Sequence, residues 1–465
     1  MEHIHFIGIG GTGLSAIAKV LLEQGLQVSG SDLTPSPLFE SVKAAGGEVF
    51  LGHQAENVRG ADLVIRSSAI PEDNPEVQAA LAAGIPVLKR SEFLEQLTAG
   101  KRVLAVAGSH GKTTTTSMLV WILTDLGLDP SFIVGGVVTD LNTNAQAGNG
   151  EYFVIEADEY DYMFLGLHPR VAVVTNVEHD HPDIFPTAES FQEAFKKFVA
   201  QLDPEGTLIL CGDHPGALQL REGLNPGQGL KIYGLEKPDW DYSAIDLQVN
   251  PGAGMSFELR IQDPDAEYRL HLSLRIPGEH NVLNALAAFA LADSLGLERE
   301  KISRSLSKFT GSGRRFEIRE EIEGVLLVDD YGHHPTEILT TLTAARKAYP
   351  DRYLRVVWQP HTYSRTATLF DDFTSAFKDA DQVLILDVYE AREVKPEDFH
   401  IEDLVAAIQH DHVLYLPLIE QAAAYLEREL RAGDMLVIFT AGDAIKINDR
   451  IEGALLDRIA RRRGE

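Results

Sequence analysis

Short apolar runs alternate with helical patterns through the first part of the chain. The predicted strands are His5–Ile9, Val28–Asp32, Asp62–Ile65 and Ile85–Leu88, and a helical pattern lies at Leu14–Leu22. Strands that alternate with helices are typical of a parallel sheet with crossover helices. We therefore expect a first α/β domain over residues 1–98.

The middle of the chain combines the same alternation with a second pattern. Apolar runs predict strands at Val103–Val106, Tyr152–Ile155 and Val171–Val174, and helical patterns lie at Thr115–Leu123 and Val282–Leu295. Between residues 241 and 276, three runs alternate with period two, as antiparallel strands do: Ile245–Val249, Met255–Ile261 and Tyr268–Ile276. We expect a central α/β domain with extra antiparallel strands over residues 99–311.

The last segment returns to strands and helices in alternation. Strands are predicted at Val325–Val328, Leu354–Trp358, Val383–Leu386 and Leu436–Phe439, and a helix at Pro335–Lys347. A third α/β domain is expected over residues 312–465, with a frayed tail at Arg461–Arg463. The predicted fold is therefore three α/β domains in series, the first and last of them Rossmann-like.

A loop suited to phosphate joins the strand 103–106 to the helix that follows. It reads Gly108-Ser109-His110-Gly111-Lys112-Thr113-Thr114. At such a helix start the backbone N–H groups and the helix dipole favour an anion, and Lys112 adds a positive charge. The Thr113 hydroxyl can reach a Mg²⁺ that bridges phosphates. We expect this loop to bind ATP rather than to be a glycine turn with a solvated lysine.

A second glycine loop, Gly8-Ile9-Gly10-Gly11-Thr12-Gly13, follows the first predicted strand. Its glycines permit a tight turn and a close approach to a pyrophosphate, and Asp32 after the next strand could accept a hydrogen bond from a ribose. The alternative is a turn that serves only strand–helix packing. Together with the lysine loop, this motif favours two separate nucleotide ligands over a nicotinamide-dependent dehydrogenase.

Polar residues follow two of the central strands. Glu156 ends one apolar run, and His181 lies shortly after the next. A carboxylate, an imidazole and the Thr113 hydroxyl are suitable ligands for Mg²⁺ or Mn²⁺. The neighbouring Asp158, Glu159, Glu178 and His179 are equally well explained as solvated strand ends.

Composition narrows the class of protein. The formal net charge of −29 argues against nucleic acid as a partner. No apolar run approaches the roughly 20 residues of a membrane span. The single cysteine, Cys211, fits a reducing compartment, and with no basic leader at the start we expect a cytoplasmic protein.

Taken together, these motifs resemble the Mur ligase family, the ATP-dependent amide-forming enzymes of peptidoglycan synthesis. The most specific stretches are His5–Gly11, Val28–Asp32, Arg66–Ile70, Asp329–Pro335 and Pro360–Thr366. Within the family, the resemblance is greatest to members that join L-alanine to the lactyl carboxylate of UDP-N-acetylmuramate through an acyl phosphate. Members that attach a recycled tripeptide to the same acceptor are the alternative.

The resemblance also implies residue roles. The UDP-substrate would be bound by Gly8, Gly10, Gly11, Thr12, Gly13, Ser31, Asp32, Ser67 and Ser68. ATP would be bound by the lysine loop with Asn281, Arg315 and Asp330, and Lys112, His181, Asn281, Arg315 and Asp330 would be catalytic. Thr113, Glu156 and His181 would hold metal, and Tyr331, His333, His361 and Arg365 the amino acid. Because Lys112, Thr113, Glu156 and His181 are all present, a catalytically silent nucleotide binder is disfavoured. We expect a monomer or weak homodimer.

Overall fold

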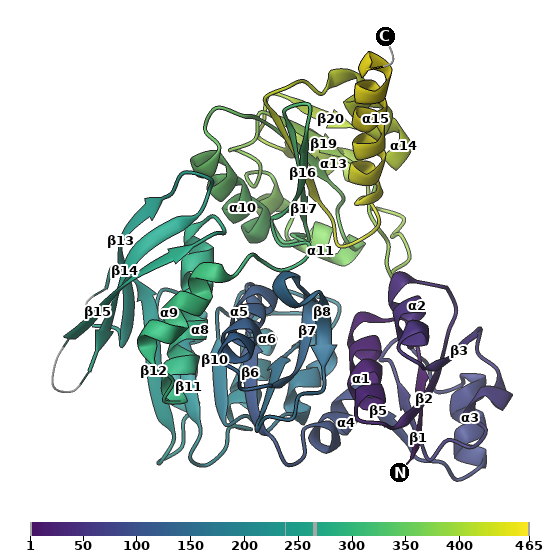
Figure 1. The fold of residues 1–465 in the computed structure, drawn as a ribbon. Helices are drawn as coiled ribbons and strands as arrows, with labels where there is room; N and C mark the ends of the chain where they lie inside the picture. The colour runs from purple at the N-terminus through teal and green to yellow at the C-terminus, as the bar shows by residue number, and fades with distance from the viewer. Residues whose placement is uncertain (1, 238, 264–266, 464–465) are drawn as a thin grey trace.

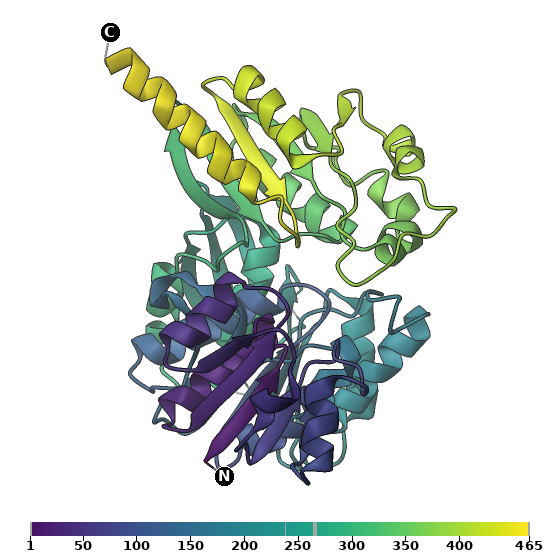
Figure 2. The same cartoon turned by 90° about the vertical axis from the view of Figure 1, so that its right-hand side faces the viewer.

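The computed structural model describes residues 2–237, 239–263 and 267–463, which form three sheets in chain order (Figure 1). In this view the first and second sheets lie side by side, and the third lies above them. Turning the molecule shows the third sheet and its helices facing the loops of the other two (Figure 2). This arrangement brings loops from all three parts of the chain together.

The first sheet is entirely parallel and has the strand order β3-β2-β1-β4-β5. Its strands are β1 His3–Ile7, β2 Gln27–Asp32, β3 Glu48–Leu51, β4 Leu63–Arg66 and β5 Val87–Lys89. The helices are α1 Thr12–Glu23, α2 Pro37–Ala44, α3 Pro75–Ala82 and α4 Arg90–Leu97. The strand order reverses at β1, so the loops after β1 and β4 diverge and leave a crevice of the kind that binds ligands.

The second sheet has the order β15-β14-β13-β12-β11-β10-β6-β9-β7-β8. Its strands are β6 Arg102–Ala107, β7 Ser131–Val138, β8 Thr143–Gln146, β9 Tyr152–Glu156, β10 Val171–Val174, β11 Thr207–Cys211, β12 Gly229–Leu235, β13 Tyr242–Val249, β14 Met255–Gln262 and β15 Glu267–Leu274. The helices are α5 Lys112–Asp125, α6 Ala188–Val199, α7 Pro215–Gln219, α8 Glu279–Ser294 and α9 Arg299–Lys308. Strands β13 to β15 are antiparallel, as the period-two pattern predicts.

The third sheet has the order β16-β17-β21-β18-β19-β20, and β16 is antiparallel to β17. Its strands are β16 Glu317–Ile322, β17 Val325–Asp330, β18 Tyr353–Trp358, β19 Gln382–Ile385, β20 Val413–Tyr415 and β21 Asp434–Phe439. The helices are α10 Pro335–Ala348, α11 Tyr363–Thr368, α12 Phe370–Phe373, α13 Ile401–Ala407, α14 Ile419–Glu429 and α15 Lys446–Arg463.

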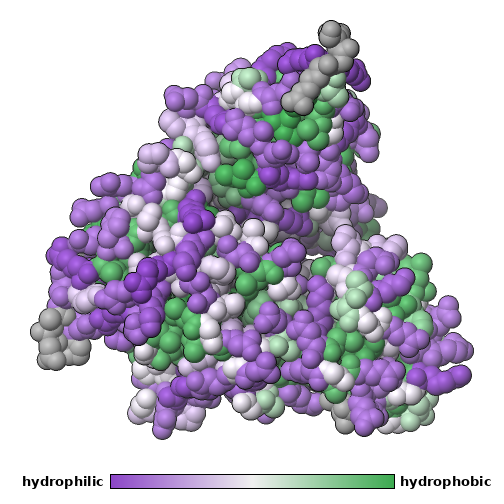
Figure 3. Space-filling view, in the orientation of Figure 1, coloured by the Kyte–Doolittle hydropathy of each residue, from purple (hydrophilic) through white to green (hydrophobic). Residues whose placement is uncertain are grey.

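The structure confirms the predicted α/β fold with three successive sheets, whereas the domain limits at 98 and 311 stay a prediction. The predicted frayed tail is wrong, because α15 extends through Arg463 and Arg462 pairs with Glu323 at 2.7 Å. The face in Figure 3 is mostly hydrophilic, in keeping with the acidic composition. Among the described residues, no helix is both long and apolar enough to cross a membrane.

Candidate active site

The phosphate loop has the predicted strand–loop–helix geometry. Strand β6 ends at Ala107, and α5 begins at Lys112 after Gly111. Gly111 has φ 79°, and a Cβ there would lie 2.4 Å from Asn284 Oδ1, so a larger residue is excluded. The N-terminus of α5 thus stays open for an anion.

Lys112 is held among carboxylates at the head of α5. Its Nζ donates to Ser109 O at 3.1 Å and lies 2.9 Å from Glu159 Oε2. Burial alone would lower the pKa of Lys112, but the charges of Glu159, Asp158 and Glu156 outweigh it and raise the pKa. The lysine therefore keeps its positive charge where a phosphate would bind.

The predicted metal ligands lie on the same side of the loop. Thr113 Oγ1 donates to Glu156 Oε1 at 3.0 Å, and the other oxygen of Glu156 accepts from Gly135 N at 2.7 Å. Arg315 Nη2 reaches Thr113 Oγ1 at 3.3 Å from the other side. This contact brings Arg315, which the family resemblance implies is an ATP-binding residue, to the phosphate loop.

His181 lies between the second and third sheets. Its backbone has φ 54°, and its N–H donates to Asp180 Oδ1 at 2.7 Å. Asp180 in turn pairs with Arg365 Nε at 2.8 Å, and both side chains are about 5% exposed. Burial would raise the pKa of Asp180, but Arg365 and the nearby histidines hold it well below its usual range. Arg365 of the third domain thus holds Asp180, and Asp180 holds the backbone of His181.

The loops after β1 and β4 meet in the first domain. A Cβ on Gly8 would lie 3.0 Å from Ser67 Cβ. A Cβ on Gly13 would lie 1.9 Å from Arg90 Nη1, so Gly13 makes room for this guanidinium. Arg90 also pairs with Asp158 at 3.0 Å and so links the first domain to the central one. No motif in the sequence had indicated Arg90.

Ser31 and Asp32 have other partners than the predicted substrate. Ser31 is fully buried, and its hydroxyl donates to Glu76 Oε2 at 2.6 Å. Asp32 Oδ2 accepts from Gly10 N at 2.9 Å and so shapes the glycine loop. Neither residue, nor Gly10, lines the cavity described below. Their contact with the UDP-substrate stays a prediction. In the structure Asp32 holds the backbone of the glycine loop, and Ser31 satisfies the buried carboxylate of Glu76.

A smaller cavity of about 200 Å³ lies behind the phosphate loop. Asn281 and Asp330 line it together with His110 and Thr114. Asp330 accepts backbone N–H bonds from Phe316 at 2.8 Å and Gly332 at 2.6 Å, and burial raises its pKa to about 6.

A larger cavity of about 900 Å³ joins all three domains. Its lining includes the predicted residues Gly8, Gly11, Thr12, Gly13, Ser67, Ser68, Ser109, Gly111, Lys112, Thr113, Glu156, His181, Arg315, Tyr331, His333, His361 and Arg365. Gly108 does not line it, although its carbonyl accepts a hydrogen bond from Lys112. Loops far apart in the sequence therefore face one space.

The predicted amino-acid residues form one wall of this cavity. The rings of His333 and His361 lie 5.6 Å apart, and His361 stacks on Tyr389 at 5.7 Å. Tyr331 is contacted by Arg314 at 4.9 Å and by Arg315 at 4.6 Å. Burial, with Arg365 and Arg392, lowers the pKa of His361 to about 4, so this imidazole is neutral near pH 7.

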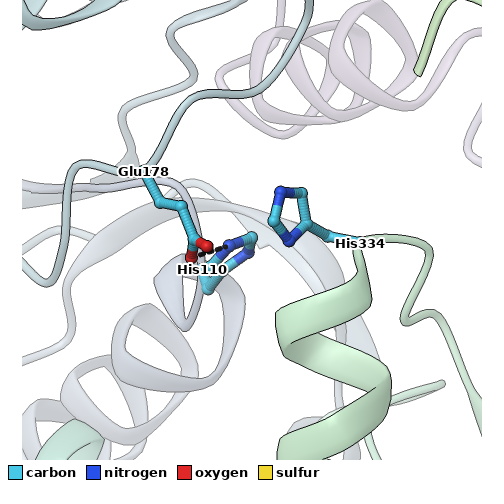
Figure 4. Close-up of side chains that lie close together, drawn as sticks. All are labelled: His110, Glu178 and His334. Carbon is cyan, nitrogen blue, oxygen red and sulfur yellow. Dashed lines mark hydrogen bonds and ion pairs between the residues drawn. The ribbon is translucent and has the colours of Figure 1, made fainter. Parts of the chain in front are cut away.

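His110, Glu178 and His334 form a separate cluster in which one possible ligand atom from each lies within 4.8 Å of the others (Figure 4). His110 contacts Glu178 at 3.1 Å and Glu337 at 3.2 Å, so both ring nitrogens face carboxylates. His334 Nδ1 accepts from Thr336 N at 3.3 Å, which leaves the proton on Nε2. We therefore interpret the cluster as an ion-pair link between the phosphate loop and α10, and not as a metal site.

The link predicts a pH-dependent stability. Burial would lower the pKa of His110, but Glu178 and Glu337 raise it to about 9, above its ordinary 6.5. The protonated imidazole stabilises the folded protein by about 3 kcal/mol, and this contribution is complete below pH 6.5. It disappears as the pH rises through 9, where His110 loses its proton in the folded protein as well. Thermal unfolding of the wild type and of His110→Gln should converge over this range. Curves that stay parallel from pH 6 to 9.5 would contradict the link.

Comparison with known proteins places this geometry in a family. The model described as Mur ligase family, catalytic domain, matches residues 3–102. The Mur ligase middle domain matches residues 106–292, and the Mur ligase glutamate ligase domain matches residues 314–442. The chain belongs to the Mur ligase family. A nicotinamide-dependent dehydrogenase is accordingly not favoured.

Relatives within the family match along nearly the whole chain. UDP-N-acetylmuramate–L-alanine ligases from Desulforamulus reducens and Acidithiobacillus ferrooxidans are 42% and 44% identical, over 95% of this chain and of theirs. The solved UDP-N-acetylmuramate–alanine ligase of Thermotoga maritima has a TM-score of 0.83 at 27% identity, covering 98% of this chain and all of that one. A murein peptide ligase from Psychrobacter arcticus has a TM-score of 0.73 at 26% identity, and the match covers 98% of this chain and 99% of that one.

Proposed function

We propose that the protein uses ATP to join L-alanine to the lactyl carboxylate of UDP-N-acetylmuramate, giving ADP and phosphate in peptidoglycan precursor synthesis. The observation that carries the proposal is the single cavity of about 900 Å³, which is faced by the first glycine loop, the phosphate loop and the His361 wall. The names of relatives more than 40% identical support the same substrates. Cytoplasmic location and a monomeric or weakly dimeric state stay predictions.

The two cavities together offer a separate place for each substrate. The crevice at Gly8, Thr12 and Ser67 would take the UDP-substrate at the reversal of strand order. The α5 N-terminus would take the ATP phosphates, and the smaller cavity beside Asn281 the nucleoside. The His361 wall would take the amino acid.

The donor set beside the phosphate loop fits a hard divalent cation. A hydroxyl and a carboxylate, Thr113 and Glu156, lie 3.0 Å apart, and the His181 imidazole lines the same cavity. We propose that these three residues hold Mg²⁺ or Mn²⁺. Such ions neutralise charge on phosphate oxygens and align the reacting groups.

The reaction then follows from the placement of charges. An oxygen of the lactyl carboxylate attacks the γ-phosphorus, ADP leaves, and an acyl phosphate forms. Lys112 and Arg315 stabilise the negative charge that gathers on the transferred group. The amine of alanine next attacks the acyl carbon, loses a proton, and expels phosphate from the tetrahedral intermediate. No enzyme nucleophile is needed, and Cys211 is buried and does not line the larger cavity.

The test is ADP release with UDP-N-acetylmuramate and a panel of amines. L-Alanine, glycine, L-serine and L-Ala-γ-D-Glu-meso-diaminopimelate should be compared at equal concentration. We expect L-alanine to give the highest kcat/KM. Turnover with the tripeptide and none with the free amino acids would replace the proposal by the recycling ligase.

His181→Ala should slow acyl-phosphate formation by about 10²–10³-fold while ATP binding changes little, because an electrostatic group near the reacting phosphate is lost. The defect should respond to Mg²⁺ or Mn²⁺ concentration differently from the wild type. A matched control is His179→Ala, whose ring contacts Phe185 O at 2.7 Å. If metal concentration affects the His181→Ala variant and the wild type equally, His181 is not a ligand.

A further inference from the structure

Six cationic side chains line the large cavity: Arg90, Lys112, Arg314, Arg315, Arg365 and Arg392. Three of these are already neutralised by carboxylates of the central domain, since Arg90 pairs with Asp158, Lys112 with Glu159 and Arg365 with Asp180. Arg314 and Arg315 stack on Tyr331. Neither of these two has a carboxylate oxygen within 4.0 Å, but Arg314 donates to Thr440 O at 2.6 Å and Arg315 to Thr113 Oγ1 at 3.3 Å. Arg392 is different, because the described residues offer its guanidinium neither a carboxylate oxygen within 4.0 Å nor a hydrogen-bond acceptor.

The guanidinium of Arg392 is exposed and rests on an aromatic ring of the central domain. Its Cζ lies 4.1 Å from the ring centroid of Tyr160. The Tyr160 hydroxyl donates to Asp183 Oδ2 at 2.9 Å, and the ring meets the edge of His181 at 5.1 Å. Stacking uses the face of a guanidinium and leaves the N–H donors on its edge free. These donors are therefore available to a ligand in the cavity that Arg392 and His181 both line.

The loop that carries Arg392 is fastened to the His361 wall on both sides. Before it, Tyr389 N donates to Pro360 O at 2.8 Å, and Tyr389 O accepts from Thr362 N at 3.0 Å. After it, Glu393 accepts from Ser364 N at 2.9 Å. The position of the guanidinium is thus set relative to His361 by hydrogen bonds and by the Tyr160 ring.

We propose that Arg392 is the residue that binds the carboxylate of the incoming amino acid, with Tyr160 as its positioning residue. The inference deepens the proposed function and rests on it. An amino acid that attacks through its amine brings a carboxylate into a cavity whose walls already carry several acidic side chains. A planar guanidinium without a carboxylate partner matches that group bidentately. Arg365 at the same end has its Nε on Asp180 and its Nη1 3.1 Å from His361 Nδ1.

The first test separates carboxylate binding from a structural effect. In Arg392→Ala, the KM for L-alanine should rise about 10- to 100-fold, as expected when a charge-assisted hydrogen bond is lost. The KM values for ATP and UDP-N-acetylmuramate should stay within about twofold, because those subsites lie at other loops. Arg392→Lys should recover part of the loss. Lys395→Ala, an exposed cation in the same loop, is the matched control.

The second test removes the carboxylate from the substrate. Alaninamide lacks the negative charge, so the wild type should strongly prefer L-alanine, and Arg392→Ala should lose that preference by about the factor by which its KM for L-alanine rises. Tyr160→Leu should raise the KM for L-alanine, whereas Tyr160→Phe, which keeps the ring, should raise it less.

The outcomes are distinguishable. A wild type that forms no ADP with L-alanine would overturn the proposed function and this inference together. A wild type that uses L-alanine, beside an Arg392→Ala variant with unchanged KM and unchanged preference over alaninamide, would overturn this inference alone. A parallel rise in all three KM values would also overturn it, because it would indicate a structural role.

Discussion

Lys112→Ala is expected to lower the rate of ADP formation by about 10²–10³-fold, the size of effect known for preorganised charges at a reacting group. Its ammonium group lies at the N-terminus of α5, where the backbone N–H groups and the helix dipole already favour phosphate. The rate is measured as ADP release at saturating substrates. An unchanged rate and nucleotide affinity would show that Lys112 serves the ion pair with Glu159 and does not bind phosphate.

Lys112→Ala also needs a control for stability, because Lys112 pairs with Glu159, whose side chain is fully buried. Removing one partner of a buried ion pair typically costs about 3–5 kcal/mol, because the remaining charge is uncompensated. Lys112→Ala alone should therefore also lower the unfolding temperature. In Lys112→Ala/Glu159→Gln the unfolding temperature should recover while ADP formation stays lost. Recovery of the activity together with the stability would contradict a direct role of Lys112.

The fold could largely be predicted because most strands are buried apolar runs. Strand β6 and helix α5 follow directly from the run Val103–Val106 and the glycine loop. The patterns left out seven strands: β3, β7, β8, β11, β12, β16 and β20. Strands β3 and β20 are short edge strands whose side chains are at most partly buried. Strand β11 is different, because it is buried inside the second sheet and its apolar run Leu208–Cys211 was overlooked. Sequence periodicity reports burial, and edge strands provide little of it.

The candidate site was predictable only where a motif is continuous in sequence. Thr113 was identified from the glycine-rich loop and Arg315 from the family resemblance, and they meet in space at 3.3 Å. Arg90 and Glu337 were missed, because their partners Asp158 and His110 lie 68 and 227 residues away. A charged residue on a helix has no local signal that distinguishes an interdomain ion pair from a solvated side chain.

Ser31 illustrates the opposite limit. The family resemblance implied a substrate contact for Ser31, which stays a prediction, and in the structure its hydroxyl donates to the buried carboxylate of Glu76 at 2.6 Å. Glu76 also accepts from Asn57 Nδ2 at 2.6 Å and lies 3.3 Å from His5 Nε2. A fully buried charge must be satisfied by its neighbours, and that demand is invisible in a local pattern.

Arg365→Ala is expected to impair both amino-acid use and the fold at the domain interface. In the structure the guanidinium pairs with Asp180, whose Oδ1 also accepts the backbone N–H of His181. Loss of the arginine leaves Asp180 buried and unpaired, at a cost of about 3–5 kcal/mol. We expect a lower unfolding temperature, a higher KM for L-alanine and a lower kcat, because His181 is no longer held in place.

The double variant Arg365→Ala/Asp180→Asn separates these effects. Neutralising Asp180 removes the unpaired charge, so the unfolding temperature should recover, while the loss of kcat should persist because the N–H of His181 faces a weaker acceptor. This pattern differs from that of Arg392→Ala, which should raise the KM for L-alanine without changing kcat or stability. If Arg365→Ala changed the KM for L-alanine alone, with wild-type unfolding, Arg365 would bind substrate directly and the ion pair with Asp180 would be dispensable.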